Sequence, residues 1–319
     1  MSPEVSIILP TFDRLHYLRP TLASVFAQTL EDWELLIADD GSNTDTRAFL
    51  EALDDPRVKI QWLPHSGKPA VARNAALREA QGKYIAFLDS DDLWLPKKLE
   101  TQIGSLRRHG NRRWSYTRFV LVDASGNPTP WARGAGWPVP DGRIFEKLVR
   151  SETVIALPSV IACRELLEQA GGFDPDLVMC EDYDLWLRLA AHSEVDAIDE
   201  PLTLVTRHAE HSGSEIISFQ DCKRVFEKVL RMSGTEHLHP ILHEKLAEVA
   251  VGLARSHAAC GNAGRALRTV LSSATYGWQY PRWWLGALQT SARVVVPQAA
   301  YRAARRYRSR RQAPSAAPR

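Results

Sequence analysis

Short apolar runs alternate with helical segments through the first third of this 319-residue chain. The runs open the segments "VSIILPTF", "WELLIADDGS", "VKIQWL" and "YIAFLDSDD". Between the first two of them, Leu18, Leu22 and Val25 follow the i, i+4, i+7 spacing of one helix face. The alternation predicts an α/β fold with a mostly parallel sheet and helices on both of its faces.

Polar residues lie at the carboxyl ends of the expected strands. They are Thr11, Asp13, Asp39, Asp40, Asp89, Asp91 and Asp92. Ligands of open parallel sheets bind beyond the carboxyl ends of the strands, so we expect these side chains to line one crevice. Asp40-Gly41-Ser42 also fits an ordinary turn or a helix N-cap, and that interpretation stays open for this segment.

The segment "LDSDDLW" at residues 88–94 places three carboxylates within four positions. One carboxylate is enough to cap a helix near Pro96, and the other two would repel it. Hard divalent cations bind clustered oxygen ligands, and Mg²⁺ typically combines one or two carboxylates with substrate phosphates. The segment therefore predicts a metal ion that carries a diphosphate.

The remaining composition excludes several classes of protein. A net charge of +2 gives the chain as a whole no electrostatic signature of nucleic-acid binding, and the four cysteines form no CxxC pair that would indicate zinc or disulfides. Neither a GxGxxG nor a GxxxxGK[ST] segment is present. No basic leader and no run of about 18 apolar residues occur, so we expect a cytoplasmic protein without a membrane span.

Five segments in this order resemble the family 2 glycosyltransferases over about residues 4–214. They are "VSIILPTFDR", "WELLIADDGS", "GKPAVARNAAL", "GKYIAFLDSDDLW" and "CEDYDLWLRLA". The resemblance implies the GT-A fold, a nucleotide-sugar donor that is usually a UDP-sugar, and Mg²⁺ or Mn²⁺. It also implies inverting transfer of the sugar to a hydroxyl, and we expect a glycan or lipid-linked acceptor.

The same resemblance assigns roles to the residues that end the strands. The nucleoside pocket would comprise Pro10, Thr11, Phe12, Asp13 and Asp40. Phe12 stands where the family frequently has tyrosine, so base stacking could persist without the hydroxyl. The metal motif DxD corresponds to Asp89 and Asp91, with Asp92 as a helper.

Arg73, in "ARN", looks like the family's base or phosphate contact. A diphosphate needs compensating positive charge, which an arginine and a metal ion can both supply. Lys68 is an equal candidate for this role, and a solvated arginine on a helix is the other interpretation of Arg73.

Glu181 and Asp182 lie at or near the start of a helix, since Leu185, Trp186, Leu187 and Leu189 surround polar positions at helical spacing. Two acidic residues in a first turn also complement the helix dipole, so the pattern alone does not decide their role. The resemblance identifies Asp182 as the general base that takes the acceptor hydroxyl proton, with Glu181 as the alternative.

A histidine near a following serine, in "TRHAEHSGS", resembles a family motif that approaches the metal or the diphosphate. His208 is the better match and His211 is its rival. The spacing departs from the usual one, and a surface loop histidine is the other interpretation.

We expect three regions along the chain. Residues 1–215 form the catalytic domain, with a nucleotide-sugar half at about 1–95 and an acceptor half at about 96–215. Residues 216–296 form a helical extension, and residues 297–319 form a basic, partly disordered tail. In the extension, two apolar stripes predict a helical hairpin: Leu242, Leu246, Val249 and Leu253, then Leu267, Val270, Leu271 and Ala274.

Near the end of the chain, aromatic and apolar residues precede a run of arginines. Trp284, Leu288, Ala292 and Val295 share one helix face, and six arginines crowd residues 302–311. This order suits a helix at a membrane interface whose basic flank attracts anionic lipid, so we expect peripheral attachment at the inner face of the cytoplasmic membrane. A solvated basic tail is the alternative, and no nucleic-acid recognition module is present.

Two other functions compete with glycosyl transfer. A sensor or assembly protein could bind a nucleotide sugar without reacting, and a nucleotidyltransferase also joins a parallel sheet to metal-binding aspartates. A sensor needs no base such as Asp182, and a nucleotidyltransferase should carry a glycine-rich basic loop where this chain reads "LPTFDRLHYL". The sequence leaves the sugar, the nucleotide and the acceptor open.

Overall fold

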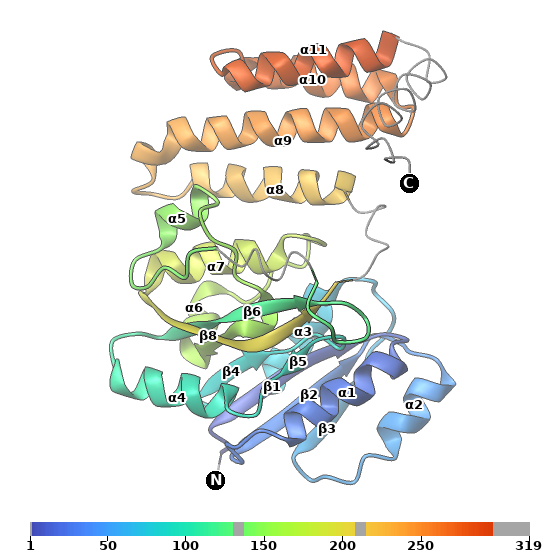
Figure 1. Ribbon diagram of the computed structural model, residues 1–319, viewed down its shortest axis with the longest axis vertical. Helices are drawn as coiled ribbons and strands as arrows, with labels where there is room; N and C mark the ends of the chain where they lie inside the picture. Colours follow the sequence, from blue (N-terminus) through green and yellow to red (C-terminus); the bar gives the residue numbers. More distant parts are fainter. Residues whose placement is uncertain (1, 130–136, 208–214, 296–319) are drawn as a thin grey trace, which may run out of the picture. The chain divides into compact units, whose positions relative to one another are not determined.

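The computed structural model describes residues 2–129, 137–207 and 215–295 (Figure 1). The chain divides into two compact units, Met1–His211 and Ser212–Arg319, here called the N-terminal and C-terminal units. Within the described residues, no helix is both long and apolar enough to cross a membrane.

The N-terminal unit alternates strands and helices as the sequence predicts. Its strands are β1 (Val5–Thr11), β2 (Trp33–Asp39), β3 (Val58–Trp62), β4 (Tyr84–Phe87), β5 (Leu93–Trp94), β6 (Trp114–Val122), β7 (Val160–Cys163) and β8 (Val195–Thr206). Its α-helices are α1 (Leu15–Phe26), α2 (Thr44–Glu51), α3 (Pro69–Glu79), α4 (Lys98–Arg108), α5 (Phe145–Val149), α6 (Arg164–Ala170) and α7 (Glu181–His192). A short 3-10 helix, η2 (Leu157–Ser159), precedes β7.

The eight strands form one sheet in the order β3-β2-β1-β4-β7-β6-β8-β5. The first four strands pair in parallel, and so do β6 and β8, which confirms the mostly parallel α/β sheet. Strand β7 joins the two parts by pairing antiparallel to both β4 and β6. The carboxyl ends of β1, β2 and β4 consequently lie at the same edge, which positions the polar residues that follow them.

Helices cover both faces of this sheet (Figure 1). On one face, alternate residues of β1 and β2 pack with α1, α2 and α4 in a core that includes Val5, Ile7, Leu9, Leu18, Leu22, Val25, Leu35, Leu50 and Leu99. On the other face, Trp186 of α7 stacks with Trp114 of β6 and contacts Phe87 of β4. Strands β1 and β2 are buried on both faces, and a shift by one residue would exchange the side chains of the two faces, so the packing on each face fixes the register.

A buried polar network closes the opposite, amino-terminal edge of the sheet. Ser6 Oγ donates a hydrogen bond to Glu34 Oε1 at 2.6 Å and accepts one from the Gly82 amide at 2.8 Å. Glu34 also accepts a hydrogen bond from the Gln81 amide and pairs with Lys59 at 2.7 Å. The pKa of Glu34 is lowered because these donors outweigh its burial.

The C-terminal unit is helical and contains α8 (Glu215–Leu230), the short 3-10 helix η3 (Glu236–Leu238), α9 (His239–Ala259), α10 (Ala263–Gly277) and α11 (Pro281–Val295). A separate core joins α9, α10 and α11 through Ala247, Val251, Ala254, Val270, Trp283 and Ala287. The helix pair α9–α10 corresponds to the expected hairpin.

The second apolar stripe predicted for this hairpin is wrong in part. Val270 is buried, but Leu267 is 39% exposed and Leu271 is 72% exposed. The inner face of α10 instead uses Ala266, Val270, Ser273 and Gly277, because small residues let α11 approach closely. A Cβ atom at Gly277 would lie 2.5 Å from the ring of Trp283.

Replacing Gly82 by alanine should destabilise the N-terminal unit. A Cβ atom there would lie 2.5 Å from the backbone nitrogen of Ser6, and backbone atoms cannot move aside cheaply. We expect Gly82→Ala to lower the free energy of unfolding by about 1–3 kcal/mol, the usual cost of overpacking. Thermal and urea unfolding followed by circular dichroism would measure it.

The matched control is Gly110→Ala, because a Cβ atom at Gly110 meets no heavy atom within 4 Å. Equal stability of the two variants would contradict the expected clash.

Candidate active site

A cleft of about 510 Å³ opens at the carboxyl edge of the sheet. Ten of the residues singled out from the sequence line it: Pro10, Thr11, Phe12, Asp40, Lys68, Arg73, Asp89, Asp91, Glu181 and Asp182. They come from the ends of β1, β2 and β4 and from the starts of α3 and α7. Asp13, Asp39 and Asp92 do not line the cleft, contrary to expectation, and His208 and His211 lie outside the described residues.

Aromatic rings form one end of the cleft. The rings of Phe12 and His65 stack with centroids 4.1 Å apart, and both residues are exposed. His65 Nδ1 lies 2.9 Å from the backbone oxygen of Asp40, which fixes the imidazole in place. Stacked, accessible aromatic faces of this kind are the surfaces on which a nucleobase packs.

The Asp40 carboxylate organises the loop beside these rings. Its Oδ1 accepts hydrogen bonds from the amide and the hydroxyl of Ser66, and its Oδ2 accepts one from the Gly67 amide, all at 2.9 Å. The helix-cap alternative does not apply to Asp40, because Asn43 caps α2 by accepting from the Thr46 amide. Asp40 therefore shapes the aromatic end of the cleft.

Asp13 joins two loops rather than lining the cleft. Its Oδ1 accepts a hydrogen bond from the Asn43 amide at 2.6 Å, and its own amide donates to Ser42 Oγ at 3.0 Å. Its φ of 52° lies in the left-handed region, where aspartate is better tolerated than most residues. The link holds the loop after β1 against the loop after β2.

The three aspartates of "DSDD" separate into two groups. Asp89 and Asp91 line the cleft and are ion-paired with Arg73 and Arg14, respectively. Asp92 is buried, and its Oδ1 accepts a hydrogen bond from the Thr206 amide at 2.7 Å. Burial and the charges of Asp89 and Asp91 raise the pKa of Asp92 well above its usual value. Asp92 thus anchors the end of β8 in this structure.

None of these aspartates caps the following helix. Helix α4 begins at Lys98, and its N-cap position is Lys97, which makes no capping hydrogen bond through its side chain. The capping interpretation of "DSDD" is therefore wrong, and the carboxylates of Asp89 and Asp91 are left facing the cleft.

Arg73 bridges two walls of the cleft. Its Nη1 donates to Glu181 Oε1 and its Nη2 donates to Asp89 Oδ1, each at 2.7 Å. The arginine is 5% exposed, so it is not a solvated surface residue. Burial alone lowers the pKa of Arg73, but the carboxylates of Asp89 and Glu181 raise it beyond its usual value, and the guanidinium stays charged. Lys68 also lines the cleft, and its ammonium donates to the Pro175 oxygen at 3.1 Å.

Helix α7 presents its first turn to the cleft. Glu181 and Asp182 are its first two residues, and the Cys180 N-cap supplies no side-chain hydrogen bond. Glu181 is held by Arg73, whereas Asp182 Oδ1 accepts only a local hydrogen bond from the Tyr183 amide at 2.7 Å among those the described residues show. Burial of its carboxyl group and the neighbouring Glu181 charge raise the pKa of Asp182 to about 7.

The carboxylates of Asp89 and Asp91 fit a hard divalent cation. Both are already paired with cationic arginines, which shows that the site demands positive charge. Within the described ranges, no three His, Cys, Asp or Glu side chains are grouped so that they could hold a metal ion by themselves. The cleft itself offers two carboxylates, and the remaining ligands of such an ion would have to come from a bound substrate.

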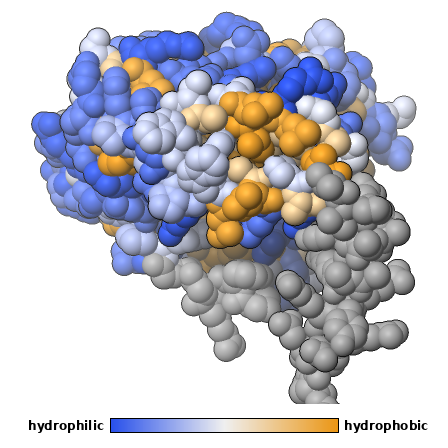
Figure 2. Space-filling view, turned by 90° about the horizontal axis from the view of Figure 1, so that it is seen from above, coloured by the Kyte–Doolittle hydropathy of each residue, from blue (hydrophilic) through white to orange (hydrophobic). Residues whose placement is uncertain are grey.

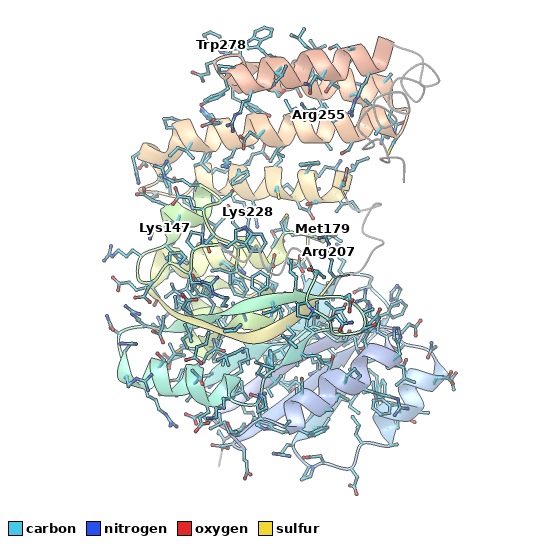
Figure 3. The ribbon with its side chains drawn as sticks, in the orientation of Figure 1. Lys147, Met179, Arg207, Lys228, Arg255 and Trp278 are labelled. Atoms are coloured by element: carbon cyan, nitrogen blue, oxygen red, sulfur yellow. The ribbon has the colours of Figure 1, made fainter. Side chains whose placement is uncertain are left out.

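The cleft residues that were not predicted from the sequence include Arg14, His65 and Met179. Arg14 directly follows the polar end of β1, and His65 follows the end of β3, so the strand-end rule could have identified both. Met179 precedes α7 in a segment without a regular pattern, and no sequence signal marks it (Figure 3).

Comparison with known proteins decides the family. Residues 6–157 match the family described as Glycosyl transferase family 2. The chain is 30% identical over 223 residues to WfgD of Escherichia coli, a UDP-Glc:alpha-D-GlcNAc-diphosphoundecaprenol beta-1,3-glucosyltransferase. That match covers 70% of this chain and 84% of WfgD. The chain belongs to glycosyl transferase family 2. Two other relatives are longer, and this family 2 glycosyltransferase spans 32% and 33% of their length.

Solved structures establish the GT-A fold of this family 2 glycosyltransferase. S. aureus TarS 1-349 in complex with UDP-GlcNAc matches with a TM-score of 0.65 at 19% identity, covering 95% of this chain and 92% of that one. Mannosyltransferase PcManGT from Pyrobaculum calidifontis, in complex with GDP-Man and Mn²⁺, matches with a TM-score of 0.58 at 20% identity. The latter match covers 92% of this chain and 86% of PcManGT.

Removal of the Arg73 guanidinium should strongly destabilise the N-terminal unit. Arg73→Met leaves the buried Glu181 carboxylate and the Asp89 carboxylate without their partner, and breaking a buried pair from one side typically costs about 3–5 kcal/mol. Urea unfolding at neutral pH would measure the loss. Arg78→Met on the same helix is the control, because Arg78 is exposed and does not line the cleft. A stability equal to that of the control would refute a structural role for the bridge.

Proposed function

We propose that this enzyme transfers a sugar, with inversion, from a nucleotide-diphosphate donor to a hydroxyl of a lipid-linked glycan acceptor. One observation carries the proposal: a single cleft brings together stacked aromatic rings, two carboxylates suited to a metal ion, and an acidic residue that no cation holds among the described residues. A binding protein without activity would not need the third feature.

The donor would span the cleft from the aromatic rings to the aspartates. The nucleobase packs against Phe12 and His65, beside the loop that Asp40 organises. The diphosphate lies toward Asp89 and Asp91, where Arg14, Lys68 and Arg73 supply positive charge. A UDP-sugar is the proposed donor, because the WfgD name specifies UDP-Glc and TarS binds UDP-GlcNAc.

Asp89 and Asp91 would hold Mg²⁺ or Mn²⁺ together with the diphosphate. When bound, the ion neutralises the charge that develops on the leaving diphosphate. The PcManGT complex contains Mn²⁺, which supports a divalent ion in this fold. We assign no metal-binding role to His208 or Asp92. His208 lies outside the described residues, and the carboxylate of Asp92 accepts a hydrogen bond from the Thr206 amide.

Asp182 would act as the general base. It takes the proton of the acceptor hydroxyl as that oxygen attacks the anomeric carbon from the side opposite the diphosphate, which inverts the configuration. A base with a pKa near the working pH is both deprotonated and basic enough to accept this proton, and the pKa of Asp182 is raised to about 7. Glu181 is a poorer general base than Asp182, because its carboxylate is ion-paired with Arg73.

A lipid-linked acceptor would place the reaction at the inner surface of the cytoplasmic membrane. The WfgD name gives GlcNAc-diphosphoundecaprenol as its acceptor, and the match covers most of both chains. The proposed enzyme would accordingly act in the cytoplasm as a peripheral membrane protein.

A donor panel tests the proposal directly. Purified enzyme would be incubated with UDP-, GDP- and dTDP-sugars, with Mn²⁺ or with EDTA, and the release of nucleoside diphosphate would be measured with and without a prenyl-diphosphate sugar acceptor. We expect metal-dependent release from a UDP-sugar that the acceptor accelerates. Absence of release from every donor would refute glycosyl transfer.

Asp182→Asn should lower turnover by roughly 10²- to 10⁴-fold, the usual share of a general base, with little change in donor affinity. In the wild-type enzyme, kcat/KM should fall as the pH drops through about 7, because protonated Asp182 cannot accept a proton. The residual rate of the variant should lose this pH dependence. Near-normal turnover in Asp182→Asn would assign the base to another residue.

Asp91→Ala should abolish the metal-dependent part of UDP binding while the protein stays folded, because Arg14, its partner, is exposed and can be solvated. Isothermal titration with UDP in Mn²⁺ and in EDTA would measure the difference. The control is Asp54→Ala, which removes an equal charge from an exposed position that does not line the cleft. Unchanged binding by Asp91→Ala would eliminate this residue as a metal ligand.

A further inference from the structure

Charge is distributed very unevenly along the chain. Residues 263–319 contain 11 arginines and no lysine, aspartate or glutamate. The net charge of the whole chain is +2, so residues 1–262 carry a net charge of −9. Four of the arginines, Arg265, Arg268, Arg282 and Arg293, belong to α10 and α11. The charged residues of these two helices are therefore all cationic, on a chain whose first 262 residues are net acidic, and Arg282 pairs with Glu248 of α9 at 3.4 Å.

Large apolar side chains are exposed on the same two helices. They are Leu267, Leu271, Trp278, Trp284, Leu285 and Leu288, here called the outer face. Leu271, Trp278, Trp284, Leu285 and Leu288 are each more than half exposed. Figure 2 shows apolar residues gathered on this side of the molecule, and Trp278 lies at the end of α10 (Figure 3). Monomeric soluble proteins rarely expose apolar side chains in such a concentration.

The opposite side of each helix is fixed by packing, so the outer face cannot turn inward. Trp283 is buried against Gly277, and its Nε1 donates to Ser273 Oγ at 2.8 Å. A Cβ atom at Gly286 would lie 2.2 Å from Val251 Cγ1, which shows how closely α11 approaches α9. Trp284 Nε1 donates to the Trp278 oxygen at 2.7 Å and joins the outer residues of the two helices.

We propose that the outer face of α10 and α11 docks onto an anionic lipid bilayer. Its leucines and tryptophans enter the interface between headgroups and acyl chains, and the arginines attract anionic headgroups. This inference extends the proposed function, since a lipid-linked acceptor resides in such a bilayer. The partner is the lipid surface itself, and no specific lipid pocket is required.

The charge pattern favours a bilayer over the other partners of an apolar surface. A second copy seated on the outer face would oppose two cationic surfaces, which repel each other. A nucleic acid would satisfy the arginines but would leave the leucines in water. An anionic bilayer satisfies both the apolar and the cationic residues.

Vesicle co-sedimentation of the full-length protein tests the proposal. The probes are two kinds of vesicle. One is phosphatidylcholine alone, and the other contains about a third phosphatidylglycerol, which gives an anionic membrane surface. We expect binding to the anionic vesicles that weakens as salt is raised.

Leu271→Ser/Leu285→Ser/Leu288→Ser should reduce the partition coefficient roughly tenfold, since apolar burial is lost. Arg268→Gln/Arg282→Gln should reduce it by about fivefold per arginine.

Matched variants control for exposure and charge. Phe26→Ser/Val154→Ser/Ile217→Ser removes three apolar residues that are 39–45% exposed outside the outer face. Arg78→Gln/Arg143→Gln removes the same charge elsewhere. Both controls should bind anionic vesicles as the wild type does, and circular dichroism would verify that every variant is folded.

Three results would overturn the proposal. The leucine variant could bind vesicles like the wild type. Sedimentation equilibrium could show a wild-type dimer that the leucine variant dissociates without a change in vesicle binding, which would identify the outer face as a self-association surface. The protein could bind a labelled DNA duplex but no anionic vesicle, which would identify a nucleic-acid partner.

Donor hydrolysis without vesicles separates this proposal from the proposed function. If the docking surface is wrong, metal-dependent release of UDP persists while vesicle binding is insensitive to the outer-face variants. If glycosyl transfer is wrong, no variant releases UDP, but the loss of vesicle binding by the leucine and arginine variants remains.

Discussion

The ion pairs of Arg73 hold the cleft together. This one buried guanidinium connects α3, on which it lies, to Asp89 after β4 and to Glu181 at the start of α7. The next residue, Asn74, adds a second tie, since its side chain donates to the Phe173 oxygen and accepts from the Phe173 amide. A buried charge without a partner is far more costly than a paired one, so the three elements keep one arrangement. The position of Asp182 relative to the two cleft aspartates follows from this constraint.

Acidic residues outnumber cationic ones both in the first 211 residues and in the lining of the cleft. Residues 1–211 carry a net charge of −9, and a nucleoside diphosphate would approach this surface against repulsion. Arg14, Lys68 and Arg73 line the cleft but offset only part of this charge, since five acidic residues line it as well. Asp91 and Asp89, which pair with Arg14 and Arg73, could also bind a divalent ion. Such an ion would bring additional positive charge to the diphosphate.

Much of the fold and of the cleft could be predicted from the sequence, for identifiable reasons. Strands β1, β2 and β4 are largely apolar runs with polar residues at or just after their carboxyl ends, and parallel pairing gathers those ends at one edge. The roles of Asp13 and Asp92 could not be predicted, because each bonds a backbone amide that is remote in sequence, of Asn43 and Thr206, respectively. The exposure of Leu267 and Leu271 was missed because helical spacing shows which residues share a face, and packing decides which face is buried.

The two units have separate cores, and they differ in how far apart in sequence their contacting elements lie. In the C-terminal unit, α8 packs with α9, α9 with both α10 and α11, and α10 with α11, so its contacts join helices that are close in sequence. In the N-terminal unit, Tyr84 of β4 pairs with Cys163 of β7, which requires closure of a long loop. Chains dominated by local contacts fold faster than chains dominated by distant ones. The slower unit is also the first to leave the ribosome, so synthesis of the helical unit gives the sheet time to form.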